Sequence, residues 1–419
     1  MLRWRIAILV SAAIAISYLD RQTLPVAIKA IEKDIPLTNE QFSYLQSAFL
    51  LAYAFLYAAG GKLTDMLGTR RGFTVVMVAW SVACISHSFA LTFAMLAVSR
   101  FLLGAGEGGG FPAATRVVAE WFSVKERATA MGIINGGSAV GAVLAPPLIS
   151  LVLLYANWRW IFVLTGLLGL MWTVWWRRAY FPPDEHPRLT PEEFQKLEPE
   201  AELPTVNISW VGLLKFKQTW GVVLAKFMSD AAWYFYLFWL PKYLYDARGF
   251  DIKAVGTFAW IPYAAAGIGC LVGGSFSSYM VRRNLSLNAA RKIALGFSAA
   301  LMPSILFVPH VRISIALAIF SLAYFGQQWW STLVIVLPAD LFPKNVVGAV
   351  AGMVGFGGAI GGILFGQFAG YLLDHGWGYK TVFSLAGTFH VIGFLILLVL
   401  IPVVRPLALQ TNLEYQAAI

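Results

Sequence analysis

The chain has 419 residues, of which 59% are hydrophobic and only 12% are charged, and its formal net charge is +10. Because about a quarter of the residues in a water-soluble domain are charged, this composition excludes a soluble globular protein and indicates an integral membrane protein. The positive charge is therefore expected along one membrane face and is no evidence for a nucleic-acid partner. Cys84 and Cys270 both lie in apolar stretches, so no disulfide framework is predicted.

Apolar windows of about 20 residues predict twelve membrane-spanning helices, six on each side of a polar break. The first six are expected at 5–28, 42–61, 73–91, 93–117, 128–152 and 158–176. The second six are expected at 217–240, 254–280, 291–308, 313–337, 346–372 and 380–402. The break at 177–216 is rich in Pro and Glu and is unsuited to lipid, so we expect a linker between a bundle at 1–176 and a bundle at 217–419.

Lys and Arg gather at both ends of the chain, in the linker and in every second loop, for example at Arg70, Arg71, Arg282 and Arg283. The opposite loops carry fewer, and these are interleaved with Asp and Glu. Since loops rich in Lys and Arg stay in the cytoplasm, both termini and the linker are predicted to be cytoplasmic.

The first predicted helix carries two adjacent charges, Asp20 and Arg21, about midway along its length. A charge at this depth is costly unless it is paired, lines a wet cavity or has a function. Neighbouring residues of a helix point about 100° apart, so the two need not be partners. One interpretation is an ion pair that locks helix packing. The other is that Arg21 binds a substrate carboxylate with its two-donor guanidinium and that Asp20 carries a proton.

The loop after the second predicted helix has the spacing Gly-x-x-x-Asp-x-x-Gly-x-Arg-Arg, formed by Gly61, Asp65, Gly68, Arg70 and Arg71. The glycines permit a tight turn and close helix approach, and the Asp can pair with a helix end or with the arginines. This pattern predicts a latch for one conformation. In the second half, Ser278 stands where the Asp would be.

Residues 119–141 and 339–361 align without gaps, which places Glu120 on Asp340 and Gly141 on Gly361. The repeat predicts two six-helix halves of common origin. Parallel halves with a site near the bilayer midplane are typical of transporters.

Three stretches carry a family resemblance: "YLDR" at 18–21, "RFLLGAGEGGGFPAATRVVAEWF" at 100–122 and "NGGSAVGAVLAPP" at 135–147. They resemble the anion:cation symporter family of the major facilitator superfamily, and the stretches at 258–274 and 325–343 are most similar to bacterial hexuronate transporters. The resemblance implies an all-α membrane protein with twelve transmembrane helices in two pseudo-symmetric six-helix bundles. It further implies a monomer in the bacterial inner membrane that needs no cofactor and whose partners are the lipid bilayer, a sugar acid anion and a proton.

Arg100 and Glu107 lie seven residues apart in the fourth predicted helix and therefore share one face. Glu107 either neutralises Arg100 or exchanges a proton, and the two interpretations are compatible at different steps. In the resembled family the Glu is the usual proton-coupling residue and the Arg its conformational partner, while the Asp and Arg of "YLDR" serve the proton path and the anion. The two repeats are offset by 220 residues, and the same offset carries Glu107 onto Gln327. A glutamine cannot titrate, so proton coupling is expected in the N-terminal half.

Other polar and aromatic side chains in the spans are candidate substrate contacts, because amides bind hydroxyl groups and indole faces cover the C–H surface of a sugar. These are Tyr53, Asn135, Ser138, Lys226, Trp233, Gln327, Gln328 and Trp330. Tyr53 matches a substrate-site position of the resembled family. For the aromatic residues the alternative is packing, and for Lys226 it is a salt bridge to Asp230, four residues on.

Several features are given no function. "GEGGGF" at 106–111 lies within a span and is not a nucleotide fingerprint. The histidines lack metal-ligand spacing, and His390 is alone in the twelfth predicted helix. No nucleophile with a base is present, so an enzyme is not expected.

The sequence predicts a proton-coupled symporter that imports a hexuronate such as glucuronate or galacturonate by alternating access. The alternatives are an aldonate, aldarate or sialic acid symporter, a sodium-coupled or exchange mode, and a non-transporting receptor-like paralogue.

Overall fold

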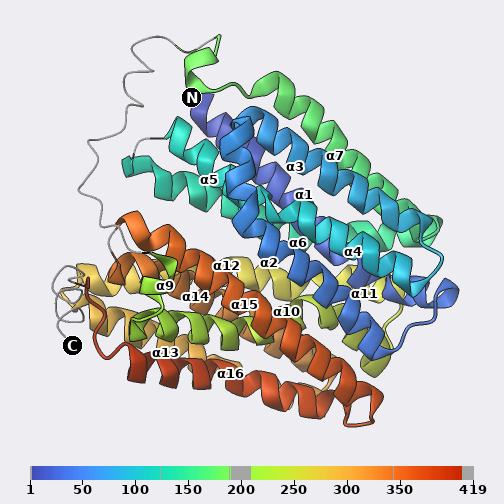
Figure 1. Cartoon of the computed structure of the whole chain (residues 1–419). Coiled ribbons are helices and arrows are strands. Elements are labelled where there is room, and N and C mark those ends of the chain that lie inside the picture. Colours follow the sequence, from blue (N-terminus) through green and yellow to red (C-terminus); the bar gives the residue numbers. More distant parts are fainter. Residues whose placement is uncertain (1, 123, 188, 190–208, 343, 408–419) are drawn as a thin grey trace. The chain divides into compact units, whose positions relative to one another are not determined.

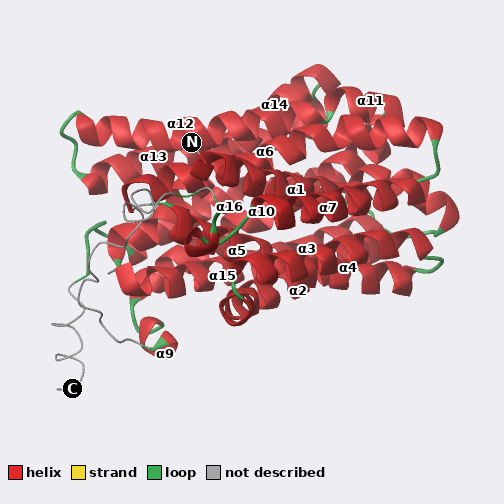
Figure 2. Ribbon diagram, turned by 90° about the horizontal axis from the view of Figure 1, so that it is seen from above, coloured by secondary structure: helices red, strands yellow, loops and turns green. Residues whose placement is uncertain are grey.

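The structure is a computed structural model that describes residues 2–122, 124–187, 189, 209–342 and 344–407. The side chains at 58–65, 119, 124–129, 210, 344 and 345 lie outside this description. Within the described residues every regular element is a helix, as Figure 2 shows.

Each predicted span falls on helix. The first half contains α1 Leu2–Asp34, α2 Asn39–Leu67, α3 Thr69–Ser86, η1 His87–Phe89, α4 Phe93–Gly108, α5 Gly110–Trp121, α6 Val124–Tyr155 and α7 Arg159–Ala179. The segment between the halves contains η2 Pro183–Glu185 and α9 Trp210–Leu213. The second half contains α10 Lys217–Arg248, α11 Ile252–Phe258, α12 Trp260–Arg282, α13 Leu287–Leu301, η3 Met302–His310, α14 Ile313–Leu341, α15 Lys344–Asp374 and α16 Gly378–Leu400.

Four of the predicted spans are interrupted, among them the span at 73–91, which passes from α3 into the 3-10 helix η1. The span at 93–117 divides into α4 and α5 at Gly109, and the span at 254–280 divides into α11 and α12 at Ala259. The span at 291–308 passes from α13 into the 3-10 helix η3, where Pro303 has no N–H for an α-helical bond. Eight helices of the described chain are long and apolar enough to cross a membrane.

The chain divides into two compact units. Unit 1 comprises Met1–Ala201, Leu237–Tyr263 and Gly366–Gly376, and unit 2 comprises Glu202–Tyr236, Ala264–Phe365 and Trp377–Ile419. α10 and α15 therefore contribute to both units. The boundaries predicted for two bundles of common origin stay a prediction.

Unit 1 is built from close helix pairs, in which α1 packs along α6, α2 along α4 and α3 along α7 (Figure 1). Glycines allow two of these pairs to approach closely. A Cβ added at Gly104 would lie 2.1 Å from the Phe49 carbonyl oxygen, and one added at Gly141 would lie 2.1 Å from the Ala15 carbonyl oxygen. A larger residue would push the helices of either pair apart.

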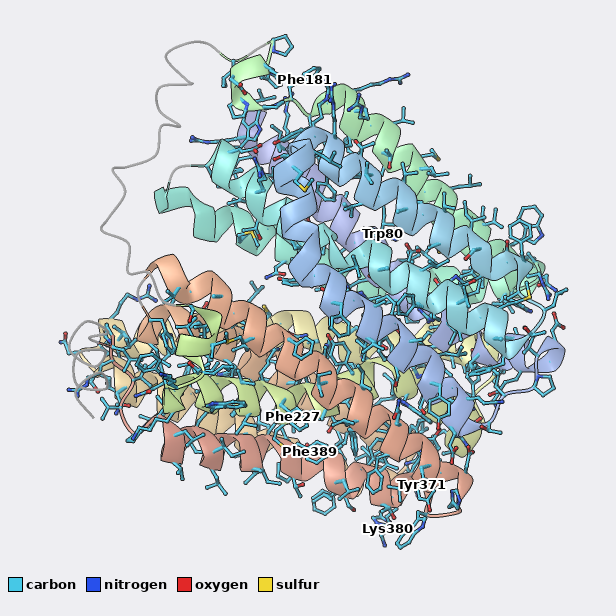
Figure 3. All side chains as sticks on the ribbon, viewed as in Figure 1. Trp80, Phe181, Phe227, Tyr371, Lys380 and Phe389 are labelled. Carbon is cyan, nitrogen blue, oxygen red and sulfur yellow. The ribbon has the colours of Figure 1, made fainter. Side chains whose placement is uncertain are left out.

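In unit 2, a glycine likewise allows two helices to approach closely. A Cβ added at Gly361 of α15 would lie 2.1 Å from the carbonyl oxygen of Phe227 in α10, a residue labelled in Figure 3. Gly361 and Gly141 are aligned by the sequence repeat, and both press against a backbone carbonyl. This shared contact supports the repeat. The apolar core of unit 2 surrounds Trp330 and Val334 of α14.

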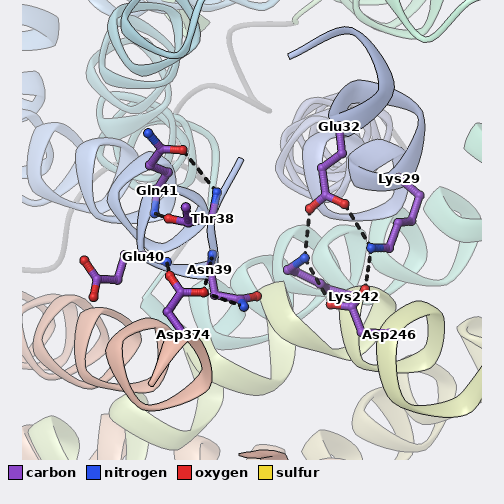
Figure 4. A network of polar contacts seen from close by, with 9 residues as sticks. All are labelled: Lys29, Glu32, Thr38, Asn39, Glu40, Gln41, Lys242, Asp246 and Asp374. Carbon is purple, nitrogen blue, oxygen red and sulfur yellow. Dashed lines mark hydrogen bonds and ion pairs between the residues drawn. The ribbon is translucent and has the colours of Figure 1, made fainter. Parts of the chain in front are cut away.

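A ring of four charged side chains joins the ends of α1 and α10 within unit 1 (Figure 4). Lys29 bonds to Glu32 at 2.9 Å and to Asp246 at 2.5 Å, and Lys242 bonds to Glu32 at 2.8 Å and to Asp246 at 3.0 Å. Each charge meets two of opposite sign, so the ring is neutral and holds the two helix ends together.

The N-terminus of α2 is capped by a residue far away in the sequence. Asp374, the last residue of α15, accepts the backbone N–H groups of Asn39 at 3.0 Å and Glu40 at 2.7 Å (Figure 4). It also accepts the Asn39 side-chain amide at 2.8 Å. Because the first N–H groups of a helix have no partner within it, this carboxylate stabilises α2 through both hydrogen bonds and charge.

Candidate functional site

Arg21 of α1 and Glu107 of α4 form a buried ion pair. The Arg21 Nε donates to Glu107 Oε2 at 2.7 Å, and the Ser17 hydroxyl donates to the same oxygen at 2.6 Å. Ser17 and Arg21 are four residues apart on one face of α1. The sequence left open whether Glu107 neutralises Arg100 of its own helix. The direct hydrogen bonds to Glu107 come instead from the Ser17–Arg21 face of α1, and Arg100 interacts with Glu107 only electrostatically.

Aromatic rings surround the Arg21 guanidinium. Its Cζ lies 4.7 Å from the centre of the Tyr18 ring, 4.6 Å from that of Tyr53 and 5.4 Å from that of Phe49. The faces of such rings attract a cation and exclude water from it. Tyr53, a predicted substrate contact, thus touches the residue predicted to bind the anion.

Asp20 faces a different set of helices. Its Oδ2 accepts the indole N–H of Trp80 at 2.6 Å, and its Oδ1 accepts the Cys84 thiol at 3.5 Å. Both donors lie on α3. As expected for neighbouring helical residues, Asp20 and Arg21 therefore turn to different partners.

Arg100 is fully buried and completes a cluster of two acids and two bases. Its guanidinium lies 5.8 Å from the Phe49 ring, and none of its nitrogens has a hydrogen-bond partner among the described residues. The second carboxylate oxygen of Glu107 also has no partner there. Arg100 interacts electrostatically with both Glu107 and Asp20. A buried cation with unused donors is costly, and an anion or a rearranged carboxylate would relieve that cost.

In unit 2, Lys226 and Asp230 of α10 form the predicted ion pair, with Nζ and Oδ1 2.9 Å apart. The Lys226 Nζ also donates to the Ser331 hydroxyl of α14 at 3.0 Å. A Cβ added at Gly358 of α15 would lie 2.3 Å from Asp230 Oδ2, so α15 passes directly over the pair. Both charged residues are buried.

Gln327 is engaged by α16. It is fully buried, and its amide oxygen accepts the Nε2–H of His390. The Trp330 ring lies 5.5 Å from the His390 ring. The sequence did not predict this contact between α14 and α16, because sequence distance does not show which helices are neighbours. Gln328, one residue on, is half-buried.

The remaining predicted substrate residues lie elsewhere. Trp233 is half-buried, with its ring 5.6 Å from that of Tyr324. Asn135 of α6 is exposed, and the Ser138 hydroxyl donates to its backbone carbonyl at 2.6 Å. Among the described contacts, none joins Asn135 or Ser138 to the Arg21–Glu107 pair.

The loop motif forms the predicted tight turn. Gly68 ends α2 and begins α3 with φ 74°, a backbone conformation that favours glycine. Arg70 donates to the carbonyl of Arg177 at 2.5 Å and lies 3.9 Å from the Phe181 ring centre, while Arg71 is exposed. Gly61 lies in α2, and the side chain of Asp65 is outside the described residues, so its predicted pairing stays a prediction.

Glu120 joins three helices beside this turn. It accepts the hydroxyl groups of Thr69 and Tyr180, each at 2.5 Å, and the Arg116 Nε at 3.1 Å. Burial and the Glu120 carboxylate raise the pKa of Tyr180 far above its usual value, so its hydroxyl remains a donor. Sequence reasoning gave Glu120 no function beyond its place in the repeat.

Several residues at the site were not predicted: Ser17, Tyr18, Trp80, Cys84, Ser331 and His390. Ser17 and Tyr18 had a usable signal, since both lie about one helical turn before Arg21 on the same helix. The others reach their partners across helices, and helix rotation is not readable from one sequence.

Residues 10–366 match the sequence profile of the Major Facilitator Superfamily. The chain belongs to the major facilitator superfamily. Members of this superfamily are transporters, so the chain is a membrane transporter and not an enzyme, and its all-α fold class is confirmed.

Within the superfamily, the chain is similar to transporters of sugar acids. It is 30% identical over 407 residues to the hexuronate transporter of Escherichia coli strain K12, covering 94% of this chain and 93% of that protein. It is 31% identical over 310 residues to the galacturonate transporter of Dickeya chrysanthemi, covering 72% and 89%. It is 28% identical over 408 residues to a probable galactarate/D-glucarate transporter of E. coli K12, covering 91% of each.

Solved structures of the superfamily share the fold. A D-xylose–proton symporter has a TM-score of 0.74 at 12% identity, covering 95% of this chain and 97% of that one. A bacterial homologue of the human lysosomal transporter Spinster has a TM-score of 0.72 at 16% identity, covering 95% of each chain.

Proposed function

We propose that the protein is a proton-coupled symporter that imports a sugar acid anion, and that this anion is a hexuronate such as glucuronate or galacturonate. The observation that carries the proposal is the buried Arg21–Glu107 pair within its aromatic surround. The similarity to hexuronate and galacturonate transporters supports the choice of substrate.

The pair offers a direct way to couple a proton to an anion. While Glu107 is charged, it occupies the Arg21 guanidinium. When Glu107 accepts a proton, it loses its charge, and Arg21 becomes available to a substrate carboxylate, for which its planar fork is well suited. Loss of the proton on the inner side restores the pair and displaces the substrate.

The other predicted residues differ in what supports their part in the proposal: some lie beside Arg21 in the structure, and others are assigned from the sequence alone. Tyr53 contacts Arg21, and Arg100 lies in the same charged cluster, so both belong to the proposed site. Asp20 is proposed as a second proton carrier. The assignments of the polar and aromatic residues elsewhere rest on the sequence alone: Asn135, Ser138, Lys226, Trp233, Gln327, Gln328 and Trp330.

Transport is proposed to follow alternating access of two bundles, at 1–176 and 217–419, joined by a cytoplasmic linker at 177–216. We place the protein as a monomer in the bacterial inner membrane with both termini in the cytoplasm. The uneven distribution of Lys and Arg supports this orientation.

A dicarboxylate such as galactarate is the second candidate substrate. Arg100 is a second buried guanidinium in the same cluster, and its donors have no partner among the described residues. Such a group suits a second carboxylate. The similarity to a probable galactarate/D-glucarate transporter points the same way.

Equilibrium binding to the purified protein tests the substrate class. Labelled D-glucuronate is competed with D-galacturonate, D-galactonate, galactarate and uncharged D-glucose, using wild type, Arg21→Lys and the exposed control Arg71→Lys. We expect the uronates to compete and glucose not to, and Arg21→Lys to weaken binding at least about tenfold, since a lysine lacks the planar fork. Equal competition by glucose would refute the role of Arg21, and preferential competition by galactarate would favour the second candidate.

A further inference from the structure

Trp80 makes a short hydrogen bond to the buried Asp20 carboxylate. Its indole N–H donates at 2.6 Å, and both residues are almost completely enclosed, at 1% and 0% exposure. The Cys84 thiol donates to the other carboxylate oxygen at 3.5 Å and lies 3.2 Å from the Thr165 hydroxyl, which also interacts with Asp20. Figure 3 labels Trp80 on α3.

The charged and titratable groups around Asp20 come from three helices. Arg21 follows it on α1 but is ion-paired with Glu107. Glu107 and Arg100 of α4 interact with it electrostatically, and Cys84 of α3 contacts it directly. The donors described at Asp20 are therefore neutral groups, the Trp80 indole, the Cys84 thiol and the Thr165 hydroxyl, rather than a cation.

An indole N–H is only a donor, so it distinguishes the two states of a carboxyl group. It stabilises the charged carboxylate, and it is less suited to the protonated acid, whose own O–H needs an acceptor. Proton uptake by Asp20 therefore weakens the bond between α1 and α3.

α4 holds Trp80 in place. A Cβ added at Gly106 would lie 2.6 Å from the Cα of Trp80, so the two helix backbones are in close contact there. Gly106 directly precedes Glu107 in α4. The Trp80 backbone is thus held against α4 next to Glu107, and the buried indole has little space in which to follow a shift of Asp20.

We propose that Trp80 is a positioning residue for Asp20 and that its indole N–H, assisted by the Cys84 thiol, sets the pH at which Asp20 takes up a proton. The inference rests on the proposed function only in treating Asp20 as a proton carrier. The step adds one proton to a carboxylate oxygen, and it weakens the hydrogen bond from the indole because the neutral acid is a poorer acceptor.

Infrared spectroscopy of the purified full-length protein without substrate tests this proposal. The carboxylic acid C=O band is followed against pH, and the same variant carrying Asp20→Asn supplies the background. Trp80→Phe keeps an aromatic ring but removes the donor. We expect the midpoint of the Asp20 band to rise by about one pH unit, which is tenfold in proton affinity. Cys84→Ala, which removes the longer contact, is expected to give a smaller shift in the same direction.

Trp172→Phe is the matched control, because the Trp172 indole donates at 2.8 Å to the backbone carbonyl of Leu9 and not to a carboxylate. It should leave the Asp20 midpoint unchanged. A Trp80→Phe midpoint equal to that of wild type and of Trp172→Phe overturns the proposal, as does an unchanged midpoint in Cys84→Ala if Trp80→Phe does not fold. No substrate is present, so a failure of hexuronate transport would leave this result standing.

Discussion

Arg21 is the residue on which the proposed transport cycle depends. A proton on Glu107 releases the Arg21 guanidinium, and a substrate carboxylate then binds it. In the structure Glu107 holds it at 2.7 Å, in surroundings closed to water. Removing one partner of a buried ion pair typically leaves the other charge uncompensated, at about 3–5 kcal/mol. In the proposed cycle a proton neutralises Glu107, and the substrate carboxylate compensates the charge of Arg21.

Glu107→Gln is the residue-scale prediction. The amide mimics the protonated acid, so Arg21 stays available and substrate exchange across the membrane should continue. Accumulation driven by a pH gradient should be lost, because no proton is released inside. Counterflow and gradient-driven uptake of labelled glucuronate in proteoliposomes measure the two activities separately. Glu185→Gln, at an exposed position after α7, serves as the control. A Glu107→Gln protein that still concentrates substrate under a proton gradient would show that coupling lies elsewhere.

At the scale of elements, glycines decide how closely the helices of unit 1 approach. Gly104 brings α4 against the Phe49 carbonyl of α2, and Phe49 in turn contacts Arg21 and Arg100. The position of the charged cluster around Arg21 and Arg100 therefore depends on a backbone contact between α2 and α4 that a single added methyl group would break.

Gly104→Ala is expected to destabilise the protein by about 1–3 kcal/mol, since the added carbon would meet backbone that cannot move aside. Gly136→Ala in α6 is the matched control, because a Cβ there meets nothing within 4 Å. It should be neutral or slightly stabilising, since alanine is the better helix former. Thermal unfolding in detergent compares the two variants. Equal transition temperatures for both would contradict the close approach of α2 and α4.

The cap of α2 gives a second prediction for an element. Asp374→Ala removes the acceptor of the Asn39 and Glu40 backbone N–H groups and should cost about 1 kcal/mol of stability. Asp374→Asn keeps an oxygen acceptor and should lose less. Hydrogen exchange at the start of α2 reports the effect locally, and exposed Asp184→Ala is the control. Unchanged protection of these amides in Asp374→Ala would show that the cap is not formed.

For the whole molecule, hydropathy and the family motifs predicted the helical spans, the superfamily and the residues of the charged cluster. The interruptions at Gly109 and Ala259 were missed, because a short break hardly changes the hydropathy of a window. The direct partners of Glu107 and Gln327, which are Arg21 and His390, were not predicted. These pairings depend on helix rotation and relative depth, which tertiary packing sets. Close packing of α4 was foreseeable from its glycines, as was the turn at Gly68.

Uptake of labelled D-glucuronate into proteoliposomes, with the proton gradient directed inward, absent or reversed, tests the central claim most directly. The account predicts accumulation only with the inward gradient, equilibration without a gradient, and no accumulation when it is reversed. Uptake to the same level under all three conditions would contradict proton coupling. An absence of uptake, together with an absence of binding of every sugar acid tested, would contradict the proposed substrate class.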